Sequence, residues 1–284
     1  MNGKIMVSEH VDYYPENFGI QRDPFEATPD PFFYYKSQNH ATVLEWVTEA
    51  IDQRELGLVI GEQGSGKTVL ARFLANSLDN KRYKICWISD PQITPLTFLK
   101  TICTSLLDIE PHNQKKEVQQ QIKQGLIALF QRGIRPIVIV EDAHEIRQKA
   151  IFDEIRQLSN FQIGIQNLIS IIMFGRPALD KRLKHQAYHI FLERLHFSIV
   201  LTPLGRKETK YYLLNRLQLA GLIASFPFAE DAVVRIWELS GGIPRSINQI
   251  ASLSMARSAK AKLNEISIDQ VNAVANDLFP RTNK

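Results

Sequence analysis

The order of apolar and polar residues predicts that short strands and longer helices alternate along the first two thirds of the chain. Helical periodicity, with apolar residues three and four positions apart, covers 67–78, 94–107, 115–131 and 150–161. Between these segments lie short runs of mainly apolar residues, at 56–60, 83–89, 135–142, 167–175 and 196–204. Strands that are apolar on both faces are typical of a parallel sheet covered by helices on both sides. We therefore expect an α/β fold.

The strand pattern stops after Leu204, and only helical periodicity follows, at 206–221, 229–241, 244–261 and 267–279. A further helix is expected at 39–55, before the first strand. The first 36 residues are rich in proline and aromatic residues, which favours an extended segment interrupted by turns. These patterns divide the chain into an extended segment (1–36), an α/β domain (37–205) and a C-terminal all-helical domain (206–280).

The stretch GEQGSGKT joins the first predicted strand to the helix at 67–78 and fits the pattern G-x-x-x-x-G-K-[ST]. Its glycines allow successive backbone N–H groups to point inward and, with the helix N-terminus, to bind phosphate. Lys67 is expected to bridge the β- and γ-phosphates, and the Thr68 hydroxyl to bind Mg²⁺. We expect Mg²⁺-ATP to contact Gly61, Glu62, Gln63, Gly64, Ser65, Gly66, Lys67, Thr68 and Val69.

Two carboxylates follow the apolar run at 136–140, in the order Glu141 then Asp142. Nucleotide hydrolysis requires a metal ligand and a group that orients the attacking water. By position, Glu141 is expected to hold Mg²⁺ and Asp142 to polarise the water. ATPases of this kind usually have Asp before Glu, and the shorter side chain of Asp142 favours slow hydrolysis. His144 is expected to lie behind the contacting residues or at the surface.

Three arginines complete the candidate site. Arg176 directly follows the strand at 167–175, where a side chain can sense the γ-phosphate. Arg194 precedes the last strand and is expected to act in trans on the ATP of a neighbouring subunit. Arg245 lies near the start of a helix in the C-terminal domain and is expected to reach the same nucleotide.

Composition and charge narrow the function classes. The chain is 44% hydrophobic and 23% charged, as in ordinary globular proteins, and lacks both an apolar run of membrane-spanning length and a secretory signal. Its two cysteines give no disulfide framework and suit a reducing cytosol, so we expect a cytoplasmic protein. Residues 206–284 contain 11 Lys and Arg against 7 Asp and Glu, whereas residues 1–205 contain 23 of each. This basic excess is compatible with nucleic acid, an anionic membrane surface or an ordinary solvated surface.

Longer motifs resemble one family. The segments FGIQRDPFEATPDPFFYYKSQNHATVLEWV, VIGEQGSGKTVLARFL, IIMFGRPALDKRL, LTPLGRKETKYYLLNRLQLAG and SGGIPRSINQIA are similar to those of ExeA/GspA-type ATPases of the AAA+ class, which include the MshM proteins of pilus biogenesis. The likeness covers about residues 14 to 279. It implies an AAA+ P-loop domain with a helical lid and ATP hydrolysis at subunit interfaces. Lys67, Thr68, Glu141 and Asp142 match the family's nucleotide motifs, and Arg176 stands where the family usually has Gln.

The resemblance leaves the partner open. It implies a homo-oligomer, ring or filament, that works with a secretion or pilus protein. Related AAA+ proteins of the TnsC/MuB/TniB kind regulate transposition by forming ATP-dependent filaments on DNA, which would make a transposase and double-stranded DNA the partners. A signalling or scaffold ATPase with weak turnover is the third possibility.

Overall fold

The computed structural model describes residues 17–26 and 28–278, which form two compact units. The first unit contains residues 38–63 and 67–202. The second contains the described residues up to Ser37, residues 64–66 and the chain from Pro203 onward. Expectations for residues 1–16, 27 and 279–280 lie outside the described residues.

The first unit is built on a five-stranded sheet with the strand order β2-β3-β6-β1-β7, and all neighbouring strands are parallel. The expected α/β fold with a parallel sheet is confirmed. The strands are β1 (Leu56–Gly61), β2 (Tyr83–Ile88), β3 (Arg135–Val140), β6 (Ser170–Gly175) and β7 (Phe197–Leu201). Because β6 lies between β3 and β1, the loops that follow these three strands emerge at the same edge of the sheet.

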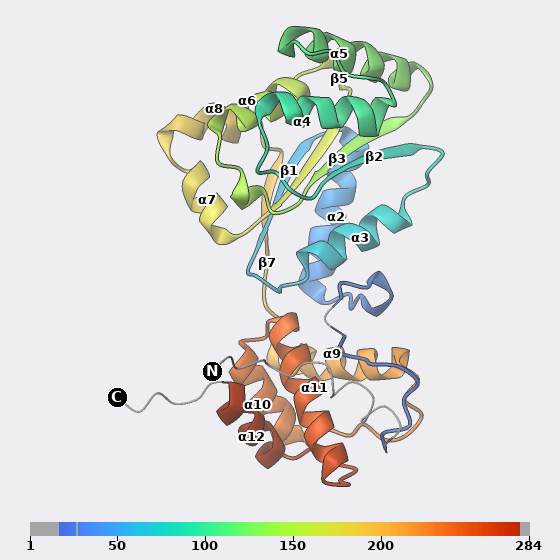
Figure 1. Cartoon of the computed structure of the whole chain (residues 1–284), viewed down its shortest axis with the longest axis vertical. Helices are drawn as coiled ribbons and strands as arrows, with labels where there is room; N and C mark the ends of the chain where they lie inside the picture. The colour runs from blue at the N-terminus through green and yellow to red at the C-terminus, as the bar shows by residue number, and fades with distance from the viewer. Residues whose placement is uncertain (1–16, 27, 279–284) are drawn as a thin grey trace, which may run out of the picture. The chain divides into compact units, whose positions relative to one another are not determined.

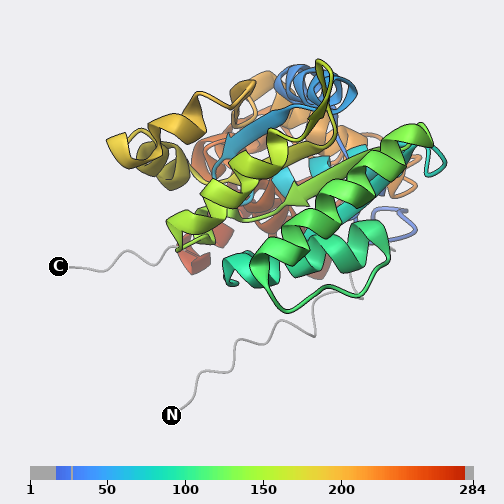
Figure 2. The same cartoon turned by 90° about the horizontal axis from the view of Figure 1, so that it is seen from above.

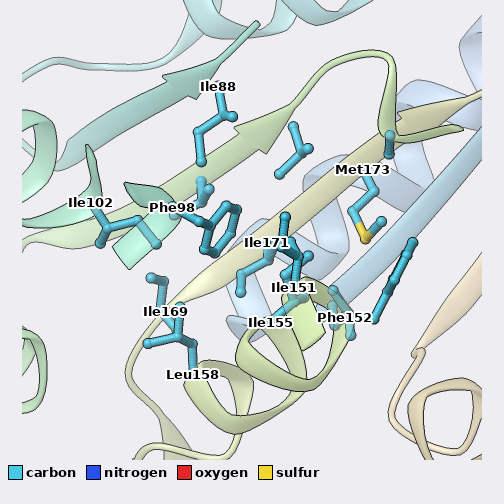
Figure 3. Close-up of a cluster of buried hydrophobic side chains, with 14 of the residues drawn as sticks. Ile88, Phe98, Ile102, Ile151, Phe152, Ile155, Leu158, Ile169, Ile171 and Met173 are labelled. Atoms are coloured by element: carbon cyan, nitrogen blue, oxygen red, sulfur yellow. The ribbon is translucent and has the colours of Figure 1, made fainter. Parts of the chain in front are cut away.

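Helices cover both faces of this sheet (Figures 1 and 2). One face carries α4, α5 and α6, and the other carries α2 and α3. Side chains alternate along each strand: Val138 and Met173 join the core beneath α4 to α6, whereas Ile139 and Phe174 are buried outside that cluster. Figure 3 shows part of the larger core. The helices are α2 (Gln38–Gln53), α3 (Lys67–Ser77), α4 (Pro95–Ile102), α5 (Lys115–Gln131) and α6 (Lys149–Ser159).

Two local features of the first unit differ from the expected pattern. The helix expected at 94–107 ends as an α-helix at Ile102 and continues as a single π-helical turn, η2 (Cys103–Leu107). A small antiparallel hairpin, β4 (Gln162–Ile163) and β5 (Gln166–Asn167), follows α6. Strands of two residues are too short to produce a recognisable alternation, so the hairpin was not predicted. After the hairpin and β6, the chain continues through α7 (Pro177–Leu183), η4 (Gln186–Tyr188) and α8 (His189–Leu192).

The second unit is helical. Its helices, α9 (Arg206–Leu219), α10 (Glu230–Ser240), α11 (Pro244–Lys260) and α12 (Ile268–Leu278), surround a core that includes Leu213, Ile236 and Ile250. The helical periodicity after Leu204 is therefore confirmed. The described part of the N-terminal segment belongs to this unit, because Phe18, Ile20, Phe25 and Phe33 are buried in the same core. Phe33 ends the short turn η1 (Pro31–Phe33).

Arg216 fastens the N-terminal segment to this helical core. Its side chain is buried, its Nε donates to the carbonyl oxygen of Pro24, and Nη1 donates to the hydroxyl of Tyr212 at 3.1 Å. The guanidinium carbon lies 4.6 Å from the centre of the Phe33 ring. A buried cation stabilises a fold only where hydrogen-bond acceptors and aromatic faces surround it, so Arg216 is a polar link between helix and segment.

Candidate functional site

The loop between β1 and α3 contains the glycine-rich motif. Gly64 and Gly66 have φ angles of +83° and +99°, a region that residues with a Cβ rarely adopt. The loop passes directly into α3, whose first N–H groups have no intrahelical acceptor. These donors and the positive end of the helix dipole favour an anion at this position.

Lys67 begins α3, and its side chain is buried. Its Nζ donates to the carbonyl oxygens of Gly61 and Glu62, each at 2.8 Å. The ammonium is thus drawn onto the loop itself. Because both of these acceptors are neutral carbonyl oxygens, they do not neutralise the charge of the ammonium, which can therefore attract an anion.

Ser65 gives a first test of whether a nucleotide suits this loop. It is buried, and its hydroxyl oxygen has no hydrogen-bond partner within the described residues. A buried polar atom without a partner is costly, and such atoms gather at ligand sites. Thr68 and Val69 lie in the first turn of α3 and are half-buried, whereas Glu62 and Gln63 are exposed. The loop therefore offers backbone donors, one cation and an unpaired hydroxyl, a set that fits phosphate.

Glu141 directly follows β3 and is buried. Its Oε2 accepts a hydrogen bond from Nε1 of Trp87 at 2.9 Å, and Oε1 has no partner within the described part of the chain. A half-satisfied buried carboxylate is a suitable ligand for Mg²⁺ or for one of its waters. Two protein ligands, the Thr68 hydroxyl and the Glu141 carboxylate, are enough for such a site, because Mg²⁺ usually keeps several waters and is bound mainly through substrate phosphates.

Asp142 differs from its neighbour in conformation and exposure. It adopts the left-handed region, with φ 43° and ψ 39°, which aspartate tolerates better than most residues. Its side chain is 57% exposed, whereas that of Glu141 is buried. The turn therefore directs two adjacent carboxylates into different surroundings, one enclosed and one open to water.

Arg176 and His144 lie at the same edge of the sheet. Arg176 occupies the position just before α7, directly after β6, and the turn η3 (Ala143–Glu145) packs against both β6 and α7. The His144 side chain is only 8% exposed, so a surface position for this residue is wrong. Burial and, next, the positive charge of Arg176 lower the pKa of His144, and the charge of Lys67 contributes in the same direction. The ends of β1, β3 and β6 thus bring the charges of Lys67 and Arg176 close to His144.

Arg194 is at the opposite end of the sheet. It precedes β7, and its Nε donates to Oγ of Ser159 at 3.2 Å and its Nη2 to Oδ1 of Asn167 at 2.9 Å. Both partners precede β6, so this arginine lies at the amino ends of the strands. A strand of five or six residues spans roughly 15–20 Å, which keeps Arg194 away from the loop of its own chain.

Arg245 is the second residue of α11 in the helical unit, and its side chain is exposed. Its expected approach to the nucleotide stays a prediction. Among residues 17–26 and 28–278, no three His, Cys, Asp or Glu side chains form a group that could hold a metal ion. No helix of the described chain is both long enough and apolar enough to cross a membrane.

Sequence reasoning missed Trp87 and left open whether His144 is buried. The contact between Trp87 and Glu141 depends on the pairing of β2 with β3, in which Trp87 lies opposite Ile139. The only signal in the sequence is that Trp87, an aromatic residue whose indole N–H can donate a hydrogen bond, lies near the end of the apolar run at 83–89. The burial of His144 depends on how η3 packs, which local sequence does not specify.

Comparisons with known proteins agree with the observed fold. Residues 50–183 match the family model of the AAA domain. The chain is 28% identical over 244 residues to general secretion pathway protein A of Aeromonas hydrophila, which covers 85% of the chain. The chain spans only 44% of the length of that relative.

Several solved structures share the fold. Cdc6p of Pyrobaculum aerophilum has a TM-score of 0.64 at 18% identity, covering 87% of this chain and 70% of that one. The ORC2 protein of Aeropyrum pernix has a TM-score of 0.65 at 13% identity, covering 90% and 72%. RuvB of Thermotoga maritima has a TM-score of 0.57 at 20% identity, covering 87% and 73%. At these identities the likeness concerns the fold alone.

Proposed function

We propose, from the premise that the chain belongs to the AAA+ class of P-loop ATPases, that it binds Mg²⁺-ATP and hydrolyses it at interfaces between copies of itself. The same proposal makes ATP-dependent assembly the means by which the protein acts on a secretion or pilus apparatus. The single observation that carries it is the meeting of the glycine-rich loop, the half-satisfied carboxylate of Glu141 and the charge of Arg176 at one edge of the sheet.

In the proposed mechanism, backbone N–H groups of the loop and the Lys67 ammonium bind the phosphates. Thr68 and Glu141 would hold Mg²⁺, and the ion would supply positive charge that neutralises the phosphates. Asp142, exposed to solvent beside this site, orients the attacking water, and Arg176 stabilises negative charge on the γ-phosphate. The two carboxylates suit these roles because one is buried and the other is accessible to water.

Arg194 completes the site of a neighbouring copy. Its position at the amino ends of the strands supports action in trans, since its own loop lies at the other end of the sheet. The hydrogen bonds to Ser159 and Asn167 fix the direction of the guanidinium. A cation held in advance of the reaction stabilises developing charge with little reorganisation.

The proposed partner system rests on the similarity to general secretion pathway protein A. The similarity extends over both units of the chain, because 244 aligned residues exceed the length of either. We therefore place a component of a secretion or pilus apparatus as the partner whose assembly the nucleotide state controls.

Replacement of the proposed water-orienting residue tests the enzymatic part. Asp142→Asn keeps the shape of the side chain but removes the charge that polarises water, so it should bind ATP normally and lose hydrolysis. Lys67→Ala should lose ATP binding itself. Asp153→Asn, an exposed acid on α6, is the matched control and should behave as wild type. Phosphate release and nucleotide binding are measured for all four proteins. Equal turnover in wild type and Asp142→Asn refutes the assignment, and no turnover in wild type refutes the proposed ATPase.

A DNA-linked transposition regulator is the second candidate, and exposed basic residues of the helical unit favour it. Arg206, Lys207, Lys260 and Lys262 are exposed near ends of α9 and α11. By contrast, Lys210 forms an ion pair with Glu230, and Arg257 forms one with Asp277. These pairs reduce the attraction of the two basic side chains for DNA phosphates. The unit therefore offers fewer cations to DNA than its sequence suggests.

A salt series distinguishes the two candidates. Each neutralised phosphate releases roughly one counterion, so a DNA-loading protein binds duplex with an affinity that falls steeply with salt. Duplex binding is measured by fluorescence anisotropy with a non-hydrolysable ATP analogue and with ADP. We expect weak binding that does not depend on the nucleotide. Tight binding that requires the ATP analogue and weakens steeply with salt favours the transposition role.

A further inference from the structure

His144 is a buried polar residue to which the proposed mechanism gives no role. Its side chain is 8% exposed, and neither ring nitrogen makes a hydrogen bond within the described residues. Two buried nitrogens without partners are costly, and a residue with such atoms needs an explanation. The residue lies two positions after Asp142, in the turn η3.

Two carboxylates flank the ring. Nδ1 lies 3.8 Å from Oδ1 of Asp142, and Nε2 lies 3.4 Å from Oε1 of Glu145. The other oxygen of Glu145, Oε2, accepts a hydrogen bond from Nε2 of Gln92 at 3.2 Å, so this carboxylate already has one donor. The Asp142 carboxylate accepts no hydrogen bond within the described chain, and the ring of His144 offers it a donor 3.8 Å away.

The charge state of the ring limits what it can do. Burial and the charge of Arg176 lower the pKa of His144 from its ordinary value of 6.5, and the neutral form therefore prevails near pH 7. A neutral imidazole has one N–H donor and one acceptor nitrogen. It can therefore donate to only one of the two carboxylates at a time.

We propose that His144 is a positioning residue, whose Nδ1–H donates to the Asp142 carboxylate and orients it toward the attacking water when nucleotide is bound. A shift of less than about 1 Å brings the two atoms from their present separation to hydrogen-bond distance. The Asp142 side chain, more than half exposed, has the room for this shift. The inference rests on the proposed ATPase function, because it concerns the same carboxylate.

Amide side chains test which nitrogen matters. Asparagine places an amide N–H near the position of Nδ1, and glutamine places one near that of Nε2. We expect His144→Asn to keep kcat within about threefold of wild type, and His144→Gln and His144→Ala to lose roughly 10- to 100-fold in kcat with KM unchanged. His112→Asn, at a half-exposed histidine, is the matched control. Recovery by Gln but not by Asn, or equal kcat in all variants, overturns the proposal.

A second measurement does not depend on turnover. Imidazole ¹⁵N chemical shifts, assigned by comparison with His144→Asn, report which ring nitrogen carries the proton. With Mg²⁺ and a non-hydrolysable ATP analogue, we expect the Nδ1-protonated tautomer of His144. The Nε2-protonated tautomer overturns the proposal. Absence of ATP hydrolysis by the wild-type protein refutes the proposed ATPase function. In that case the ¹⁵N shifts alone test whether Nδ1 of His144 carries the proton.

Discussion

Replacing Trp87 with phenylalanine removes one hydrogen bond from a buried carboxylate. The indole N–H lies 2.9 Å from Oε2 of Glu141, whose other oxygen already lacks a partner in the described structure. A hydrogen bond to a charged group contributes about 1.5–3 kcal/mol, and its loss also leaves the carboxylate buried without a donor. We therefore expect Trp87→Phe to lower the free energy of unfolding by about 2–3 kcal/mol in the absence of nucleotide.

Metal and nucleotide should restore part of this loss. If Glu141 holds Mg²⁺, the bound ion supplies the positive charge that the indole N–H no longer provides. The difference in unfolding free energy between wild type and Trp87→Phe should then fall to about half when Mg²⁺ and an ATP analogue are present. Magnesium alone, without nucleotide, should restore much less.

Urea denaturation followed by circular dichroism measures this difference under each condition. Trp46→Phe is the matched control, because Trp46 lies on α2, is 42% exposed and makes no hydrogen bond within the described residues. It should cost less than about 1 kcal/mol in every condition. A loss at Trp87 below about 0.5 kcal/mol contradicts the importance of the contact. An equal loss with and without Mg²⁺-nucleotide contradicts the metal role of Glu141.

Three further predictions follow from burial. Arg216→Ala should lower the free energy of unfolding by roughly 3 kcal/mol, because its buried guanidinium contacts are lost. Arg257→Ala, at an exposed ion pair, should change it by less than about 1 kcal/mol. Equal losses for the two variants in urea denaturation contradict the link described for Arg216. Burial raises the pKa of the thiols of Cys86 and Cys103 to about 11, so neither should react with a thiol reagent in the native protein at pH 8, and rapid labelling of the folded protein refutes this. Because the pKa of His144 is lowered on folding, the unfolded chain binds more protons below about pH 6.5, so wild type should lose stability relative to His144→Gln as pH falls from 7.5 to 5.5; a constant difference contradicts the shift.

Much of the α/β unit follows from the sequence, because each central strand is a short run of buried aliphatic residues between amphipathic helices. Val138 and Ile139 point to opposite faces and are both fully buried, which is why the run reads as a strand covered on two sides. The glycine-rich loop is equally local, since positive φ at Gly64 and Gly66 is a property that these residues supply themselves.

The rest depends on which segments meet in space. Strand order decides that Trp87 reaches Glu141, and no local pattern gives that order. Arg194 was expected from its place before a strand, yet its partner Asn167 belongs to a hairpin too short to be predicted. His144 was expected either behind the contacting residues or at the surface, and only the packing of η3 against β6 and α7 decides that it is buried.

A subunit-mixing experiment tests the shared site most directly. Arg194→Ala retains the loop lysine and lacks the trans-acting arginine, whereas Lys67→Ala has the opposite defect. Each should be nearly inactive alone at a protein concentration that allows assembly. In a random equal mixture, one half of the loops are intact and one half of their neighbours carry the arginine, so about a quarter of the interfaces should be active.

Two controls accompany the mixing experiment, a second substitution at Arg194 and a mixture that contains a double variant. Arg194→Gln is studied beside Arg194→Ala, and thermal unfolding confirms that both remain folded after losing the hydrogen bonds to Ser159 and Asn167. A mixture of Arg194→Ala with the double variant Lys67→Ala, Arg194→Ala should stay inactive, because no copy supplies the arginine. ATP hydrolysis in the mixture of the two single variants should recover to about a quarter of the wild-type rate if Arg194 acts in trans. Hydrolysis that stays at the level of the separate variants at every mixing ratio contradicts this role of Arg194.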